Sequence, residues 1–146
     1  MLREPLLYLS LYLRQNRDEY YRLIGGCRTE GDWEAWVVFF LEGVATTTDD
    51  AVRTARALVD TFERDRQRIQ DLGRRTGSAL RVQDVLKSRP VLVLPEVVTR
   101  SGLSFPAAAA AMDALEELGV VRELTGKKRN RVFAYSEYLR LLSEGT

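Results

Sequence analysis

Apolar residues recur at helical spacing through the first half of the chain. A run of leucines after Pro5, at Leu6, Leu9 and Leu13, predicts an early helix. A stronger repeat starts at position 33, where apolar residues are three or four apart: Trp33, Trp36, Val37, Phe40, Leu41 and Val44. Residues at this spacing share one side of a helix, so the repeat predicts a helix with a broad buried face.

Glycines and polar residues divide this region into three to four predicted helices. Gly25-Gly26 should end a second helix that starts near Arg17. The threonines at 46–48 should end the next helix, and Thr48 suits the N-cap of another. The charged stretch at 64–68 in that last helix favours a solvated face. The alternative is a helix that pairs with a second copy of the chain.

The pattern changes at residues 73–78, where two glycines bracket polar side chains. Such a segment is typical of a linker between domains. We therefore predict a helical segment over residues 1–72, a linker at 73–78, a second domain over 79–138 and a C-terminal tail at 139–146.

The second domain begins with two predicted helices and a short strand between them. Helical spacing covers residues 79–88, and the apolar run Val91-Leu92-Val93 predicts the strand. Another helix should begin at Leu94, with Pro95 in its first turn.

A tight turn and a third helix follow. Gly102 suits the left-handed position after a helix, and Ser104 suits the N-cap of the next one. This third helix should reach Leu118 and bury the stripe formed by Ala108, Ala111, Met112, Leu115 and Leu118.

Two strand-like stretches close the domain, at residues 120–124 and 131–135. The six residues between them include Gly126 and several basic side chains, so the pattern predicts a β-hairpin. Helix, strand, helix, turn, helix and hairpin is the order of a winged helix-turn-helix domain. The predicted fold class is therefore mainly α, with a helical segment of three to four helices before a winged helix-turn-helix that has a small β-hairpin.

Composition narrows the functional classes. The 146 residues are 45% apolar and 29% charged, and no apolar run approaches the ~20 residues that cross a bilayer, so we expect no membrane partner. The lone Cys27 fits a reducing cytoplasm. Histidine is absent, which excludes His-based acid–base catalysis and His metal ligands in this chain. We predict no catalytic residue and no metal ligand.

Charge favours contact with double-stranded DNA. Net charge is only +1, yet residues 122–131 hold five basic side chains against one acidic one. Basic loops neutralise phosphates without reading sequence. The candidate nucleic-acid-binding residues are Ser104, Lys127, Lys128, Arg129, Asn130 and Arg131.

The third helix itself argues against strong sequence reading. Its expected outward positions are Ala107, Ala109, Ala110, Asp113 and Ala114, whereas bases are read mainly by Arg, Lys, Asn and Gln. Three carboxylates, of Asp113, Glu116 and Glu117, should repel phosphate. Two hypotheses remain open: weak or nonspecific DNA binding, and an interaction, dimerisation or regulatory module.

Several stretches resemble the C-terminal portion of Fic/Doc family proteins. They are Arg3-Glu4-Pro5-Leu6-Leu7-Tyr8-Leu9-Ser10, Glu19-Tyr20-Tyr21, Glu30-Gly31-Asp32-Trp33-Glu34-Ala35-Trp36 and Phe39-Phe40-Leu41-Glu42-Gly43-Val44. One branch of that family ends in a winged helix with a segment similar to Lys128-Arg129-Asn130-Arg131-Val132-Phe133-Ala134-Tyr135.

The resemblance implies a non-catalytic region of an AMP-transferring family. Active members move AMP, or another phosphate-containing group, from a nucleotide to a protein hydroxyl through a motif of the form HPFxDGNGR. Nothing here matches that motif, and its base cannot be present in a chain without histidine. The implied ATP and Mg²⁺ would belong to a parent enzyme, of which this chain would be a fragment or a naturally short relative. A second copy of the chain, bound through the helical segment, is a further expected partner.

Overall fold

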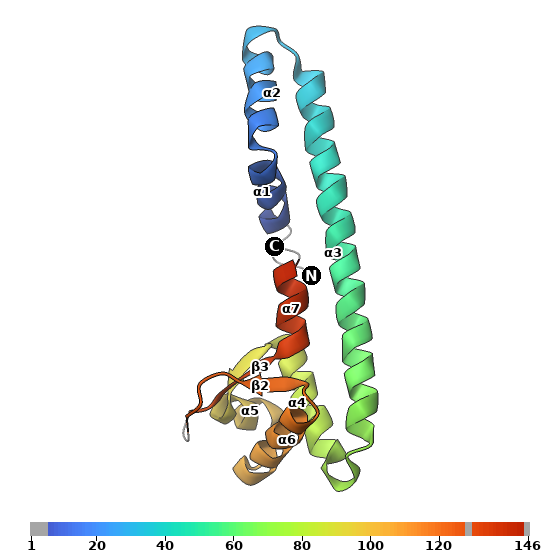
Figure 1. Ribbon diagram of the computed structural model, residues 1–146, viewed down its shortest axis with the longest axis vertical. Helices are drawn as coiled ribbons and strands as arrows, with labels where there is room; N and C mark the ends of the chain where they lie inside the picture. The colour runs from blue at the N-terminus through green and yellow to red at the C-terminus, as the bar shows by residue number, and fades with distance from the viewer. Residues whose placement is uncertain (1–5, 128–129, 145–146) are drawn as a thin grey trace. The chain divides into compact units, whose positions relative to one another are not determined.

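A computed structural model describes residues 6–127 and 130–144 (Figure 1). The described chain is mainly helical and has one small antiparallel sheet. It forms two compact units, one of residues 1–56 with 144–146 and one of residues 57–143. No helix in the described ranges is both long and apolar enough to cross a membrane.

The first unit contains α1 (Leu6–Gln15), α2 (Arg17–Thr29) and the beginning of α3 (Trp33–Gln70). The chain turns back between α2 and α3, so the two helices run antiparallel (Figure 1). Asp32 caps α3, because its Oδ1 accepts a hydrogen bond from Ala35 N at 3.2 Å.

Gly43 allows α1 and α3 to approach closely. The rings of Tyr12 and Phe39 lie 5.6 Å apart, and a Cβ added at Gly43 would lie 2.6 Å from Tyr12 Cδ1. A real Cβ almost never comes so near, so this crossing depends on the missing side chain.

The predicted end of α2 at Gly25-Gly26 is wrong, because the helix continues to Thr29. Glu30 N donates to Gly26 O at 2.9 Å, and the Thr29 hydroxyl donates to Gly25 O at 3.1 Å. Leu23 and Cys27, four residues apart, are both buried on one side of the helix. That burial offsets the unfavourable helix propensity of two glycines, which is about 1 kcal/mol each.

The predicted break at 46–48 is also wrong, since α3 is one helix of 38 residues. The Thr47 hydroxyl donates to Gly43 O at 2.8 Å, and the Thr48 hydroxyl donates to Val44 O at 2.7 Å. Both threonines therefore bond within the helix, in place of the N-cap role expected for Thr48.

The predicted broad buried face of α3 is wrong as well. Phe39 is buried, whereas much of the apolar repeat faces solvent: Trp33 is 62% and Leu41 58% exposed, and Val37 and Val44 are exposed too. The buried side lies about a third of a turn away, where Phe39 and Gly43 face α1.

The second unit begins inside α3 and continues through a short 3-10 turn, η1 (Gly73–Arg75), into α4 (Thr76–Ser88). The predicted linker at 73–78 therefore lies within this unit, and its last three residues form the start of α4. The Thr76 hydroxyl donates to Ile69 O at 3.3 Å, which ties the turn to the end of α3.

The remaining elements follow the predicted order. They are β1 (Val91–Val93), α5 (Leu94–Ser101), α6 (Phe105–Glu117), β2 (Val121–Glu123) and β3 (Val132–Tyr135). The sheet order is β1-β3-β2, with β3 antiparallel to both neighbours. Leu92 pairs with Phe133 on one side of β3, and Val121 pairs with Tyr135 on the other.

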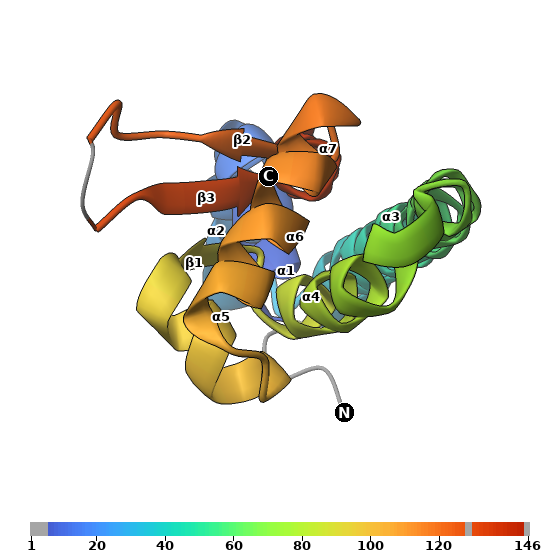
Figure 2. The same ribbon diagram turned by 90° about the horizontal axis from the view of Figure 1, so that it is seen from below.

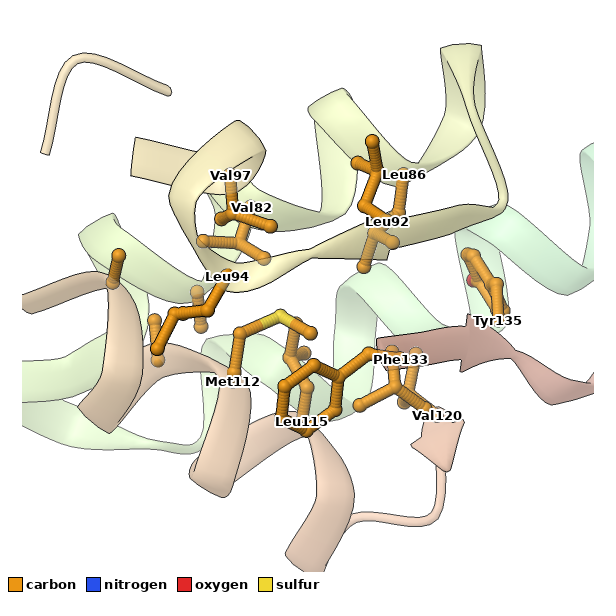
Figure 3. Packing of buried hydrophobic residues seen from close by; sticks show 14 of the residues in the cluster. Val82, Leu86, Leu92, Leu94, Val97, Met112, Leu115, Val120, Phe133 and Tyr135 are labelled. Atoms are coloured by element: carbon orange, nitrogen blue, oxygen red, sulfur yellow. The ribbon is translucent and has the colours of Figure 1, made fainter. Parts of the chain in front are cut away.

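One hydrophobic core joins these helices and strands (Figure 3). Most of the predicted inner stripe of α6 is fully buried there, whereas Leu118 is half-buried at the edge. The figure labels Val82, Leu86, Leu92, Leu94, Val97, Met112, Leu115, Val120, Phe133 and Tyr135. Burial of this kind contributes about 1.5–3 kcal/mol for each large apolar side chain.

A buried polar pair links α3 to the sheet. Asp65 is 1% exposed, so the solvated face predicted at 64–68 does not include it. Tyr135 Oη donates to Asp65 Oδ2 at 3.0 Å, while Arg64 and Arg68 pair with Oδ1 at 3.2 and 3.3 Å. Burial raises the pKa of Tyr135 well above its usual range, so the phenol remains a donor.

The predicted tail at 139–146 is wrong over its described part, because α7 (Ser136–Glu144) follows β3 directly. Tyr138, at the start of α7, packs edge-on against Phe62 with ring centroids 5.3 Å apart. The contact between Tyr138 and Phe62 therefore holds α7, a helix that the apolar spacing of the sequence did not predict.

Candidate nucleic-acid interface

The turn between α5 and α6 has the predicted geometry. Gly102 has φ 67°, the left-handed conformation, and its N–H donates to Val98 O at 3.1 Å. Ser104 caps α6, with its Oγ accepting from Ala107 N at 3.4 Å. The cap uses one lone pair of the exposed Ser104 hydroxyl, whose O–H group is a potential donor to an anion at the start of the helix.

One exposed side of α6 carries short or acidic side chains, and Phe105 is exposed at the first position of the helix. Pro106, Ala110, Asp113 and Glu117 are exposed at intervals of three and four residues. Ala114, expected to face outward, is fully buried. The amides and guanidinium groups that read bases are absent from this helix.

Arg131 connects the base of the hairpin to α6. Its Nη1 lies 3.1 Å from Asp113 Oδ1, and its Nη2 lies 3.1 Å from Glu116 Oε2. The guanidinium carbon also lies 4.6 Å from the centroid of the Phe133 ring. These ion pairs partly neutralise the positive charge of Arg131, which was predicted to bind phosphate.

The same interactions change the electrostatics of α6. All three of its carboxylates are paired, since Glu117 lies 3.3 Å from Arg75. The repulsion expected between this helix and a phosphate is therefore reduced. It is not abolished, because one Arg131 serves two carboxylates.

Glu123 organises the start of the β2–β3 connection. Its Oε1 accepts from Thr125 N at 2.9 Å and from the Thr125 hydroxyl, and its Oε2 accepts from Gly126 N at 2.7 Å. The hydrogen bond from the Thr125 hydroxyl lowers the pKa of Glu123, with smaller contributions from the two backbone N–H groups. The Glu123 N–H in turn donates to Glu116 Oε1 at 3.1 Å, so α6 supports this strand too.

The hairpin runs out past α5 and α6 toward its connection (Figure 2). Lys127 and Asn130 are exposed, and Asn130 has φ 53°. Lys128 and Arg129, predicted to bind phosphates, lie outside the described residues. Ser104 is placed at the other end of α6 from the carboxylates that hold Arg131, so the predicted residues form two groups.

No protein-family model matches this chain. The side chains themselves therefore carry the functional argument, and the resemblance to Fic/Doc proteins remains a hypothesis.

Three further basic side chains, Arg122, Arg81 and Arg100, were not predicted as binding residues. Arg122 is exposed on β2, next to the connection, and was noted only as part of the basic segment. Arg81 and Arg100 line one open hollow between α4 and α5, together with Asp84, Val85, Ser88 and Ser101. Asp84, in the same hollow, pairs with Lys87 at 2.9 Å. The sequence did not indicate that Arg81 and Arg100 would lie at the same hollow, because the hollow arises from the packing of α4 and α5.

The described residues include no cluster of three or more cysteine or carboxylate side chains that could hold a metal ion.

Proposed function

We propose that residues 79–138 form a winged helix-turn-helix that binds duplex DNA weakly and with little sequence preference. The basic connection between β2 and β3 carries the proposal, because Lys127 is exposed there and the base of the hairpin is braced on α6 through Arg131. In this geometry α6 would face the major groove and the connection would touch phosphates.

The weak sequence preference follows from the exposed side of α6. An alanine methyl such as that of Ala110 can touch a thymine methyl, yet it cannot distinguish donors from acceptors on a base edge. Phosphate neutralisation then supplies the affinity, which for nonspecific binding is about 10⁻⁴–10⁻⁶ M at physiological salt.

The test is binding of a fluorescent random duplex at a series of salt concentrations. We compare the natural chain with Lys127→Glu/Lys128→Glu/Arg129→Glu. The expected result is a steep fall of affinity with salt for the natural chain. For the variant, the slope of log affinity against log salt should be shallower by about three, close to one for each phosphate that is no longer neutralised.

Two controls sharpen this test. Arg14→Glu/Arg17→Glu/Arg28→Glu makes the same change in net charge on exposed residues of α1 and α2, and should leave the slope unchanged. Arg131→Gln should lower the stability of the second unit and leave the salt dependence of DNA binding almost unchanged, because the Arg131 charge already pairs with carboxylates of α6. Equal losses of affinity for both triple variants, or no binding at low salt, would contradict the proposal.

A protein-binding module is the second candidate. It is favoured by Phe105, which is 55% exposed at the start of α6 beside short side chains. An exposed aromatic side chain is a common anchor in protein interfaces. Phe105→Ser should leave nonspecific DNA binding unchanged and weaken capture of a protein partner. A loss of DNA affinity in that variant would favour the first candidate.

The resemblance to Fic/Doc proteins supports a proposal about context. The chain would be a non-catalytic C-terminal region of a Fic-type protein in the cytoplasm, with ATP and Mg²⁺ used only by a parent enzyme. Incubation of this chain with labelled ATP, Mg²⁺ and candidate proteins should transfer no AMP. Transfer by the chain alone would show that its chemistry is of another kind, since it contains no histidine.

A further inference from the structure

One side of α3 carries a long series of exposed, mostly apolar residues. We call them the α3 stripe: Trp33, Val37, Leu41, Val44, Thr48, Val52 and Ala55. The stripe has an 11-residue repeat, which joins Val37 to Thr48 and Leu41 to Val52. Eleven residues make about three full turns, so the stripe stays on one side of a straight helix.

The stripe has no partner within the described first unit. The apolar side chains buried there are Leu23, Cys27 and Phe39, and Phe39 lies on a different side of α3. The stripe extends for about 33 Å along the helix, from the rise of 1.5 Å per residue. A continuous apolar surface of this length usually marks an interaction site.

We propose that the α3 stripe binds the same stripe of a second copy of this chain, in antiparallel orientation, about a twofold axis beside Val44. The spacing reads almost identically in both directions, so Val37 would meet Val52 of the second copy and Leu41 would meet Thr48. Joined in this way, the two α3 helices would cover each other's exposed face in a twofold-symmetric pair. This proposal concerns residues 1–56 and does not rest on DNA binding by the second unit.

Charge at the edge of the stripe favours a second copy as the occupant. Glu34 and Arg56 are both exposed, and neither has an ion-pair partner within the described ranges. They are 22 residues apart, close to six turns, so they flank the stripe on the same edge. Antiparallel helices bring like edges together, so Glu34 of each copy would meet Arg56 of the other.

A parallel dimer offers no such pairing between Glu34 and Arg56. In a parallel dimer in register, Glu34 and the other copy's Arg56 would be about 33 Å apart along the axis. The unpaired charges thus distinguish the antiparallel dimer from the parallel one.

The first test measures the mass of the full chain by sedimentation at increasing concentration. The natural chain should dimerise in the micromolar range. Val44→Glu places two carboxylates at the twofold axis and should weaken dimerisation about 100-fold or more. The control is Thr46→Glu, an exposed position of the same helix on the side away from the stripe, which should leave the dimer unchanged. Circular dichroism should show equal helix content in all three chains.

The second test addresses orientation through a charge exchange. Glu34→Arg should weaken the dimer about ten-fold, because two attractive pairs become repulsive. Glu34→Arg/Arg56→Glu should restore it. A parallel dimer would show no rescue, because these residues would not meet.

Three results would overturn the proposal. The first is a chain that stays monomeric to about 100 µM, well above the micromolar range in which a specific dimer of moderate affinity forms. The second is a dimer that tolerates Val44→Glu. The third is a dimer in which adding Arg56→Glu does not rescue Glu34→Arg. If the chain is monomeric yet binds DNA, only this inference fails. If it dimerises without binding DNA, only the proposed function fails.

Discussion

Residues 57–143 and residues 1–56 use apolar side chains in opposite ways. In the second unit, Phe133, Leu115 and Val82 lie in a core built from helices and strands. In the first unit, α1 and α2 leave one side of α3 uncovered, and Leu41 and Trp33 remain exposed. Apolar periodicity therefore produces a core only where neighbours approach from several directions, as the layered elements of the second unit do.

The largest expected effect comes from breaking that core. Leu115 is 0% exposed, and Leu115→Ala should lower the free energy of unfolding of the second unit by about 2–5 kcal/mol through reduced burial and a cavity. Leu124→Ala is the matched control, because Leu124 is 47% exposed in the same unit and should change stability by less than about 0.5 kcal/mol. Urea unfolding measures both, and equal changes would contradict the assigned core.

The next effect concerns the buried polar pair. Tyr135→Phe removes the donor to Asp65 and should cost about 2 kcal/mol, since the buried carboxylate no longer accepts that hydrogen bond. Tyr21→Phe, at an exposed position in the first unit, should cost almost nothing. Thermal unfolding of the two variants compares a satisfied buried hydroxyl with a solvated one.

Alkaline pH provides an independent measure of the same pair. Because burial raises the pKa of Tyr135, the unfolded chain releases this proton first, near its usual pKa of about 10. The stabilisation is complete below that pH and is lost as pH rises above it. The natural chain should therefore lose stability above pH 10 more steeply than Tyr135→Phe, and identical slopes would contradict the burial.

Local signals predicted the order of elements in the second unit, and long-range contacts explain what they missed. The roles of Gly102 and Ser104 could be predicted from sequence because a left-handed turn and an N-cap involve only neighbouring residues. The burial of Asp65 could not be predicted from sequence, since its hydrogen-bond partner Tyr135 is 70 residues away along the chain. Its neighbours in sequence are arginines, which are typical of a solvated surface.

The same distinction applies to the candidate interface. The exposed, basic character of the connection around Lys127 followed from composition. The role of Arg131 did not, because Asp113 and Glu116 are 18 and 15 residues away in sequence. In the first unit, the repeat placed several apolar residues on one side of α3, yet periodicity alone could not show that much of that side is exposed and not buried.

Two glycines sharpen the comparison within the first unit. Gly25→Ala should stabilise the helix by about 0.5–1 kcal/mol, because nothing lies within 4 Å of the added Cβ. Gly43→Ala adds the same group at 2.6 Å from the Tyr12 ring, so the gain in helix propensity should be cancelled by displacement of that ring. Thermal unfolding should separate the two variants, and NMR shifts of the Tyr12 ring should move only in the second. Equal stabilisation would mean that α1 is not held against α3.

The smallest effect should arise at Glu123, at the edge of the well-packed unit. Its carboxylate accepts bonds from Thr125 and Gly126, and these lower its pKa below the usual carboxyl range. A depressed pKa stabilises the folded loop above the unfolded pKa, and the contribution is lost as pH falls through the folded value. The Gly126 amide shift should therefore titrate in acid at a midpoint below the ordinary value for a glutamate carboxyl. Glu123→Gln should remove that titration while leaving global stability almost unchanged, because the group is solvated. A midpoint at the ordinary value would contradict these hydrogen bonds to Glu123, and the bracing of the hairpin would then rest on the contacts of Arg131 with Asp113 and Glu116.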